Sequence, residues 1–182
     1  EYETGYIPGR KRNPSREQKA LALAAKSQLV LYCMGLDEPS ELEGSDRKDL
    51  SVPEEQILLL QKIYEVNPNI VVLLSTGSAV DLWWERYCSA VVYCQLGGQA
   101  GASAILEVLL GKVCPSGRLS ETWLLHYEDT PAYHYFPGPE RTAEYRESIF
   151  VGYRYYQSAG VPVRYPFGYG LTYGDAAVTA VT

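Results

Sequence analysis

Three short apolar runs, separated by stretches of helical periodicity, constrain the fold of this chain most strongly. The runs occupy residues 29–34, 70–74 and 90–94. Continuous apolar runs of this length are typical of parallel strands that are buried on both faces. Helical patterns precede the first two runs and follow the last, at residues 15–26, 54–65 and 101–110. This alternation predicts an α/β fold, a three-layer αβα sandwich with a mostly parallel, flavodoxin-like sheet.

Local signals indicate where the helices begin. Ser15 and Gln18 have capping-box spacing, so we expect Ser15 to be the N-cap of the first helix. Pro53, followed by two glutamates, favours the start of the second helix. We therefore divide the chain into a leading segment and linker (1–14), an α/β sandwich domain (15–174) and the start of a following domain (175–182).

Charge and cysteine content exclude several partners. The net charge of -6 and the lack of a basic stripe argue against nucleic acid or a membrane as a partner. An oligomer is compatible with this composition. Cys33 and Cys94 lie in apolar runs, and the four cysteines have no metal-ligand spacing, so we expect buried free thiols and no metal or cofactor. Without a signal peptide we expect a reducing, cytoplasmic location. Because the chain begins at Glu1 rather than Met, we also expect it to be part of a longer protein.

The segment between the first apolar run and the second helix is unusually acidic. Of the ten residues at 37–46, five carry carboxylates: Asp37, Glu38, Glu41, Glu43 and Asp46. In open α/β sheets, ligands bind at loops that leave the carboxyl ends of the strands, so these carboxylates are candidates for chemistry. The competing interpretation is a solvated acidic loop.

Several motifs occur in an order that resembles one enzyme family. They are ELEGSDR at 41–47, VNPNIVV at 66–72, GQAG at 98–101, PSGRL at 115–119, VGYRYY at 151–156 and PFGYGLTY at 166–173. Together they resemble the second, α/β sandwich domain of the family 3 glycoside hydrolases. The resemblance covers nearly the whole chain, and the last residues, 175–182, look like the start of a fibronectin type III-like domain.

The resemblance implies half of an active site. In that family a (β/α)8 barrel supplies an Asp nucleophile, and the sandwich domain supplies the general acid/base. Retaining hydrolysis needs the two carboxyl groups about 5 to 5.5 Å apart. The implied activity is that of a retaining, exo-acting β-glucosidase-like enzyme on terminal non-reducing β-D-glucosyl residues of a β-glucoside or oligosaccharide. A barrel domain of the same protein, absent from this chain, would complete the site.

The resemblance places the general acid/base at Glu43, directly before Gly-x-Asp-Arg, with Glu41 as the alternative. On an extended loop, residues two apart face the same way. We therefore expect Glu41 to lie beside Glu43, where like-charge repulsion favours the protonated form that a general acid needs. We also predict that Asp46 and Arg47 brace the loop by pairing with each other or with the backbone.

Two other functions stay open. A non-catalytic carbohydrate-binding module could have the same fold, although a binder has no need of an acid beside the sugar oxygen. A flavodoxin-like nucleotide or flavin binder would need a phosphate-cradling loop at a strand end, where the acidic loop would repel phosphate. Three tryptophans could stack on a sugar or, alternatively, belong to a core or an interface: Trp83, Trp84 and Trp123.

Overall fold

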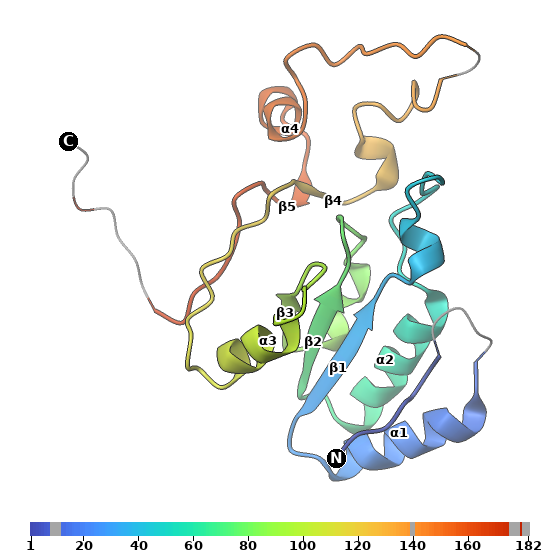
Figure 1. Ribbon diagram of the computed structural model, residues 1–182, viewed down its shortest axis with the longest axis vertical. Helices are drawn as coiled ribbons and strands as arrows, with labels where there is room; N and C mark the ends of the chain where they lie inside the picture. Colours follow the sequence, from blue (N-terminus) through green and yellow to red (C-terminus); the bar gives the residue numbers. More distant parts are fainter. Residues whose placement is uncertain (8–11, 139–140, 175–178, 180–182) are drawn as a thin grey trace. The chain divides into compact units, whose positions relative to one another are not determined.

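The computed structural model describes residues 1–7, 12–138, 141–174 and 179 (Figure 1). The chain forms two compact units. Unit 1 comprises Glu1–Leu96 and Leu125–Glu128, and unit 2 comprises Gly97–Leu124 and Asp129–Thr182.

Unit 1 is built around a parallel sheet with the strand order β1-β2-β3. Its strands are β1 (Val30–Gly35), β2 (Ile70–Ser75) and β3 (Ala90–Tyr93), and its helices are α1 (Pro14–Lys26), α2 (Glu54–Val66) and the 3₁₀ helices η1 (Glu38–Glu41) and η2 (Trp83–Tyr87). Helices α1 and α2 lie side by side on the same side of β1 (Figure 1). The predicted α/β fold with a parallel sheet is confirmed.

The core of unit 1 lies between α2 and one face of the sheet. In β2 the side chains of Ile70, Val72 and Leu74 are fully buried. Helix α2 contributes its own buried apolar residues to this core: Ile57, Leu59, Leu60 and Ile63. Burying such side chains contributes roughly 1.5 to 3 kcal/mol each, so this contact holds the sheet and α2 as one body.

The first strand differs from its prediction. Tyr32 and Met34 of β1 are buried, but Leu31 and Cys33 point to the opposite face and are exposed. The expectation that this strand is buried on both faces is therefore wrong, and so is the expectation of a buried Cys33 thiol. An uninterrupted apolar run cannot distinguish one buried face from two, because every residue in it is apolar.

The beginning of the chain also differs in detail. Helix α1 begins at Pro14, and Asn13 is its N-cap, with a side-chain oxygen that accepts a hydrogen bond from the backbone N–H of Arg16. The predicted cap at Ser15 is therefore wrong by two residues. Residues 1–7 pack on the rest of unit 1: the Tyr6 hydroxyl donates to the Cys33 carbonyl at 2.8 Å. The predicted following domain, 175–182, lies outside the described residues except for residue 179.

Unit 2 holds most of the second half of the chain and is sparsely packed. It contains α3 (Gly101–Leu109), α4 (Tyr153–Ala159) and a small antiparallel pair, β4 (Trp123–Leu124) with β5 (Val163–Tyr165). Phe167 stacks on Tyr153 with ring centroids 4.8 Å apart. The Tyr173 hydroxyl donates to the Val108 carbonyl at 2.8 Å, which ties the end of this unit to α3. Among the described residues, no helix is both long and apolar enough to cross a lipid bilayer.

Candidate active-site loop

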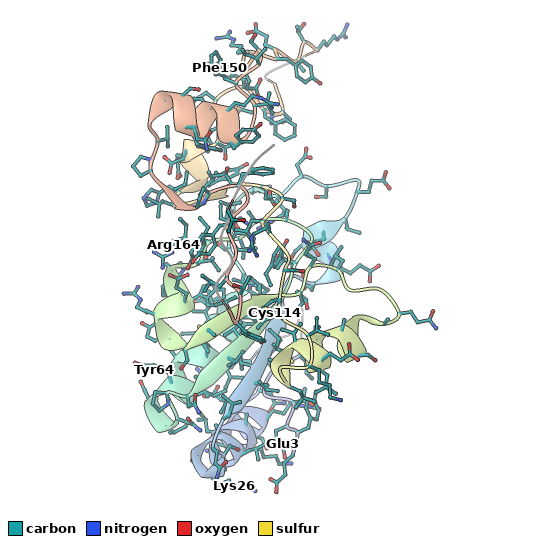
Figure 2. The ribbon with its side chains drawn as sticks, turned by 90° about the vertical axis from the view of Figure 1, so that its left-hand side faces the viewer. Glu3, Lys26, Tyr64, Cys114, Phe150 and Arg164 are labelled. Atoms are coloured by element: carbon teal, nitrogen blue, oxygen red, sulfur yellow. The ribbon has the colours of Figure 1, made fainter. Side chains whose placement is uncertain are left out.

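Two loops leave the same edge of the parallel sheet. Residues 36–53, here called the acidic loop, connect β1 to α2, and residues 76–82, here called the β2 loop, connect β2 to η2. Because β1 and β2 are parallel neighbours, their carboxyl ends meet at this edge. Figure 2 shows side chains that end in red oxygen atoms projecting from the pale-blue ribbon after β1.

Gln56 of α2 fixes the end of β1 from which the acidic loop departs. This side chain is 1% exposed. Its amide nitrogen donates to the Gly35 carbonyl, and its amide oxygen accepts from the Gly35 N–H, both at 2.9 Å. The Tyr32 hydroxyl donates to the backbone carbonyl of the same glutamine at 2.8 Å. Buried and paired polar groups of this kind define one geometry, so the acidic loop starts from a fixed point.

Glu43 lies at the tip of a turn. The Ser45 N–H donates to the Leu42 carbonyl at 3.2 Å, which places Glu43 and Gly44 at the two central positions. The Glu43 side chain is exposed. Glu41 ends the 3₁₀ helix η1 instead of preceding Glu43 on an extended segment. The expectation of two carboxylates side by side on an extended loop therefore rests on the wrong backbone conformation.

The carboxylate of Glu41 faces the β2 loop. Its Oε1 atom accepts a hydrogen bond from the backbone N–H of Gly77 at 2.5 Å. A Cβ atom at position 77 would lie 3.0 Å from that oxygen and 3.2 Å from Leu96 Cδ1. Glycine is therefore the residue that lets the carboxylate approach this closely.

Arg47 attaches the acidic loop to the β2 loop on the other side of Glu43. Its Nη1 atom donates to Ser78 Oγ at 3.0 Å and to the Ala79 carbonyl at 3.1 Å. Its Nη2 atom is buried and has no direct hydrogen-bond partner within the described part of the chain. Asp46, the other residue that we predicted to brace the loop, has an exposed side chain.

A third attachment joins the end of the acidic loop to Asp81. The Asp81 N–H donates to the Leu50 carbonyl at 2.8 Å, and the Ser51 hydroxyl lies 3.5 Å from Asp81 Oδ2. Burial raises the pKa of Asp81, and the nearby Asp49 raises it further, while the Ser51 hydrogen bond and the Arg47 charge oppose this rise. The carboxylate of Asp81 therefore lies in a partly desolvated position next to the Arg47 guanidinium.

The β2 loop is a firm support for these attachments. Thr76 is fully buried, its hydroxyl donates to the Ser78 carbonyl at 2.8 Å, and its carbonyl accepts from the Tyr93 hydroxyl at 3.1 Å. Ala79 and Val80 are buried as well. Sequence reasoning missed Gly77, Ser78 and Asp81 as partners of the acidic loop. The available signal was the Ser-Thr-Gly-Ser turn at the carboxyl end of the neighbouring strand.

The three tryptophans have different environments. Trp84 and Trp123 are 0% and 2% exposed, so they cannot stack on a sugar in this conformation. Trp83 is 46% exposed, and the Arg86 guanidinium lies 5.6 Å from the centre of its ring. In the described part of the chain, no group of three or more His, Cys, Asp or Glu side chains could hold a metal ion.

Comparison with known proteins identifies the domain type. The sequence model of the glycosyl hydrolase family 3 C-terminal domain matches residues 7–173. The thermostable β-glucosidase B of Acetivibrio thermocellus is 42% identical over 155 residues, which are 85% of this chain and 20% of that protein. The exo-α-(1→6)-L-arabinopyranosidase of Bifidobacterium longum is 39% identical over 170 residues, which are 93% of this chain and 22% of that protein.

Solved structures have the same fold. The Bifidobacterium adolescentis family 3 β-glucosidase superposes with a TM-score of 0.90 at 39% identity, over 93% of this chain and 25% of that one. The Kluyveromyces marxianus β-glucosidase in complex with glucose superposes with a TM-score of 0.83 at 36% identity, over 90% of this chain and 20% of that one. This chain thus spans between a fifth and a quarter of these relatives. It belongs to glycoside hydrolase family 3 and corresponds to the family's C-terminal domain.

Proposed function

We propose that this domain supplies the general acid/base of a retaining, exo-acting, β-glucosidase-like enzyme, and that Glu43 is the proton-transfer group. The nucleophilic carboxylate would lie on a (β/α)8 barrel elsewhere in the full-length protein. One observation carries the proposal: Glu43 is an exposed carboxylate at the tip of a turn whose two flanks are hydrogen-bonded to a buried support. A proton donor needs both properties, because it must reach the substrate and must be held in position.

The proposed role has two steps. In the first, the protonated Glu43 gives its proton to the glycosidic oxygen while the nucleophile attacks the anomeric carbon, so the leaving group departs as a neutral alcohol. In the second, the Glu43 carboxylate removes a proton from the water that attacks the glycosyl-enzyme. The same oxygen atoms serve as acid and then as base, so the side chain must stay beside the anomeric centre throughout the cycle.

Glu43 is preferred over Glu41 because of what each carboxylate contacts. Glu41 Oε1 is engaged by the Gly77 N–H and turned toward the β2 loop. Glu43 is exposed and immediately precedes Gly44, which leaves the tip of the turn unobstructed. The free carboxylate is the one that a substrate oxygen can approach.

The names of the relatives support the proposed substrate class. Their names include β-glucosidases and exo-α-(1→6)-L-arabinopyranosidases. Both types of sugar present an equatorial bond at the anomeric carbon, so one arrangement of acid and nucleophile serves both. We propose terminal β-D-glucosides as the substrate and treat α-L-arabinopyranosides as the alternative sugar.

The test is an azide experiment on the full-length protein. Wild type and Glu43→Ala are assayed with 2,4-dinitrophenyl β-D-glucoside and with the corresponding α-L-arabinopyranoside, each with and without sodium azide. The activated phenolate leaves without protonation, so Glu43→Ala should form the glycosyl-enzyme and then stall. Azide needs no base, and it should restore turnover and give a glycosyl azide with retained configuration. Glu38→Ala, a carboxylate deletion in the same loop, is the matched control and should behave as wild type.

Three outcomes would contradict the proposal. Full activity of Glu43→Ala on cellobiose, a substrate with a poor leaving group, would mean that another residue transfers the proton. A glycosyl azide of inverted configuration would exclude the retaining mechanism. A wild-type protein that binds sugars but cleaves no aryl glycoside would favour a carbohydrate-binding module.

A further inference from the structure

The flanks of the Glu43 turn are held by different kinds of contact. On the carboxyl-terminal flank, Arg47 makes two hydrogen bonds to the β2 loop, and the Leu50 carbonyl accepts a further one from Asp81. On the amino-terminal flank, the contact to the β2 loop is the hydrogen bond from the Gly77 N–H to Glu41. Leu42, between Glu41 and Glu43, is 50% exposed and gives no anchorage by burial. The Leu36 N–H donates to the Ser75 carbonyl at 3.2 Å and holds the base of this flank, so beyond that base the described residues hold the flank to the β2 loop through Glu41.

We propose that Glu41 is a positioning residue. Its carboxylate accepts the hydrogen bond from the Gly77 N–H, and this contact fixes the position of the general acid/base, Glu43. This inference rests on the proposed function of Glu43. A hydrogen bond to an ionised acceptor is about twice as strong as a neutral one, and Gly77 stands on a support whose neighbours Thr76 and Ala79 are buried. Only one residue separates Glu41 from Glu43, so a shift of the first moves the second.

Gly77 is the complementary half of this contact. A methyl group at position 77 would meet the Glu41 carboxylate at 3.0 Å, a tight contact that the carboxylate could relieve only by moving. Leu96 lies on its other side, 3.2 Å from the same point, but that side chain is 69% exposed and can move away. Gly77→Ala should therefore displace the carboxylate of Glu41 and weaken its hydrogen bond with the backbone N–H of residue 77.

Substitution by glutamine separates positioning from proton transfer. The amide oxygen of Glu41→Gln can still accept the Gly77 N–H, but an amide cannot act as a general acid at neutral pH. A positioning role thus predicts that Gln largely replaces Glu, while Ala does not. If Glu41 itself transferred the proton, Gln and Ala would be equally impaired, and azide would rescue both.

The experiment compares two substrates in the full-length protein. Values of kcat/KM are measured for cellobiose, whose sugar leaving group needs protonation, and for 2,4-dinitrophenyl β-D-glucoside, whose leaving group does not. Glu41→Ala and Gly77→Ala should lower the cellobiose value by about tenfold, because a misplaced catalytic group is costly. The dinitrophenyl value should change by less than about threefold for both variants. Glu41→Gln should restore the cellobiose value to within about threefold of wild type. Glu38→Ala, the exposed control in η1, should leave both values unchanged.

The contrary outcomes are distinct. Equal losses on both substrates, with a lowered Tm, would show that Glu41 only stabilises the fold. A wild-type ratio of the two kcat/KM values in Glu41→Ala and Gly77→Ala would show that the contact is dispensable. Restoration of turnover by azide in Glu41→Gln would show that Glu41 is the acid/base. A wild-type ratio in Glu43→Gln would instead refute the proposed function, whatever the Glu41 variants do.

Discussion

The two units of this domain are packed in different ways. Among the described residues, the buried apolar side chains of unit 2 are Trp123, Leu124 and Tyr156, whereas unit 1 buries apolar residues from α1, α2, β1, β2 and η2. Unit 2 instead exposes large apolar side chains in its 145–171 segment, including Tyr145 at 91% and Leu171 at 73%. Large exposed apolar surfaces mark interaction sites in soluble proteins. Unit 1 therefore has a core that can support its own loops, while unit 2 leaves most of its large apolar side chains exposed among the described residues.

The largest loss of stability is expected from a substitution in the core of unit 1. Trp84 in η2 is fully buried, and Trp84→Ala should lower the free energy of unfolding by about 3 to 5 kcal/mol. Trp83, its 46% exposed neighbour, is the matched control, and Trp83→Ala should cost less than about 1 kcal/mol. Native-state amide exchange in β2 measures both. Equal costs would mean that η2 is not part of the core.

Amide exchange also tests how loosely unit 2 is packed. In the 182-residue chain alone, amides of α4 should exchange about 100-fold faster than those of β2, because few buried contacts oppose their opening. In the full-length protein, the exchange of α4 should slow while that of β2 stays unchanged. If α4 were as protected as β2 in the chain alone, unit 2 would be packed as firmly as unit 1.

A smaller loss of stability is expected when the buried ion pair between α1 and α2 is broken. Glu17 of α1 is buried and pairs with Arg12 at 2.5 Å and with Lys62 of α2. The hydrogen bond from Arg12, followed by that from Lys62, lowers the pKa of Glu17 from 4.5 to about 2. The folded state therefore holds the proton less readily than the unfolded state. The stabilisation is present above pH 4.5 and is lost as the pH falls toward about 2.

Glu17→Gln should thus cost about 1 to 3 kcal/mol at pH 7, and this cost should shrink in acid. Urea unfolding monitored at α1 amides between pH 7 and pH 3 measures it. Glu65→Gln, an exposed carboxylate on α2, is the control with no expected change. A cost for Glu17→Gln that is independent of pH would show that packing, and not charge, is lost.

The smallest expected effect is at Asp81. Because burial raises its pKa above 3.8, the folded state binds this proton more readily than the unfolded state. The contribution of Asp81 to stability is therefore full at low pH and is lost as the pH rises through the raised pKa. Asp81→Asn should raise the free energy of unfolding at pH 7 by up to about 1 kcal/mol, and by less at pH 3. Asp46→Asn is the exposed control, and a loss of stability in Asp81→Asn would show that its charge is needed by Arg47.

The sequence predicted the elements of unit 1 more fully than their environment. The apolar runs located the three strands of the parallel sheet, because short runs of β-branched and apolar residues between turns are typical of buried strands. The same runs could not reveal that Leu31 and Cys33 are exposed, since burial depends on what covers each face. The cap at Asn13 was missed because Ser15 has the same chemistry two residues later.

The candidate site also has a part that the sequence predicts and a part that it does not. Its carboxylates could be predicted because motif spacing is local in sequence, but the partners of those carboxylates could not. The contact between Glu41 and Gly77 joins positions 36 residues apart, and it exists only because β1 and β2 are neighbours in the sheet. Backbone donors such as the Gly77 N–H have no signature in an amino-acid sequence.

The pH dependence of cellobiose hydrolysis by the full-length protein tests directly whether Glu43 transfers the proton. In wild type, kcat/KM should fall at high pH as the general acid loses its proton. In Glu43→Gln that alkaline decline should disappear, and kcat/KM near the optimum should fall by about 10²- to 10⁴-fold. Glu38→Gln should retain the wild-type profile. A Glu43→Gln enzyme with the wild-type profile and a kcat/KM within about threefold of wild type would show that Glu43 is not the general acid/base.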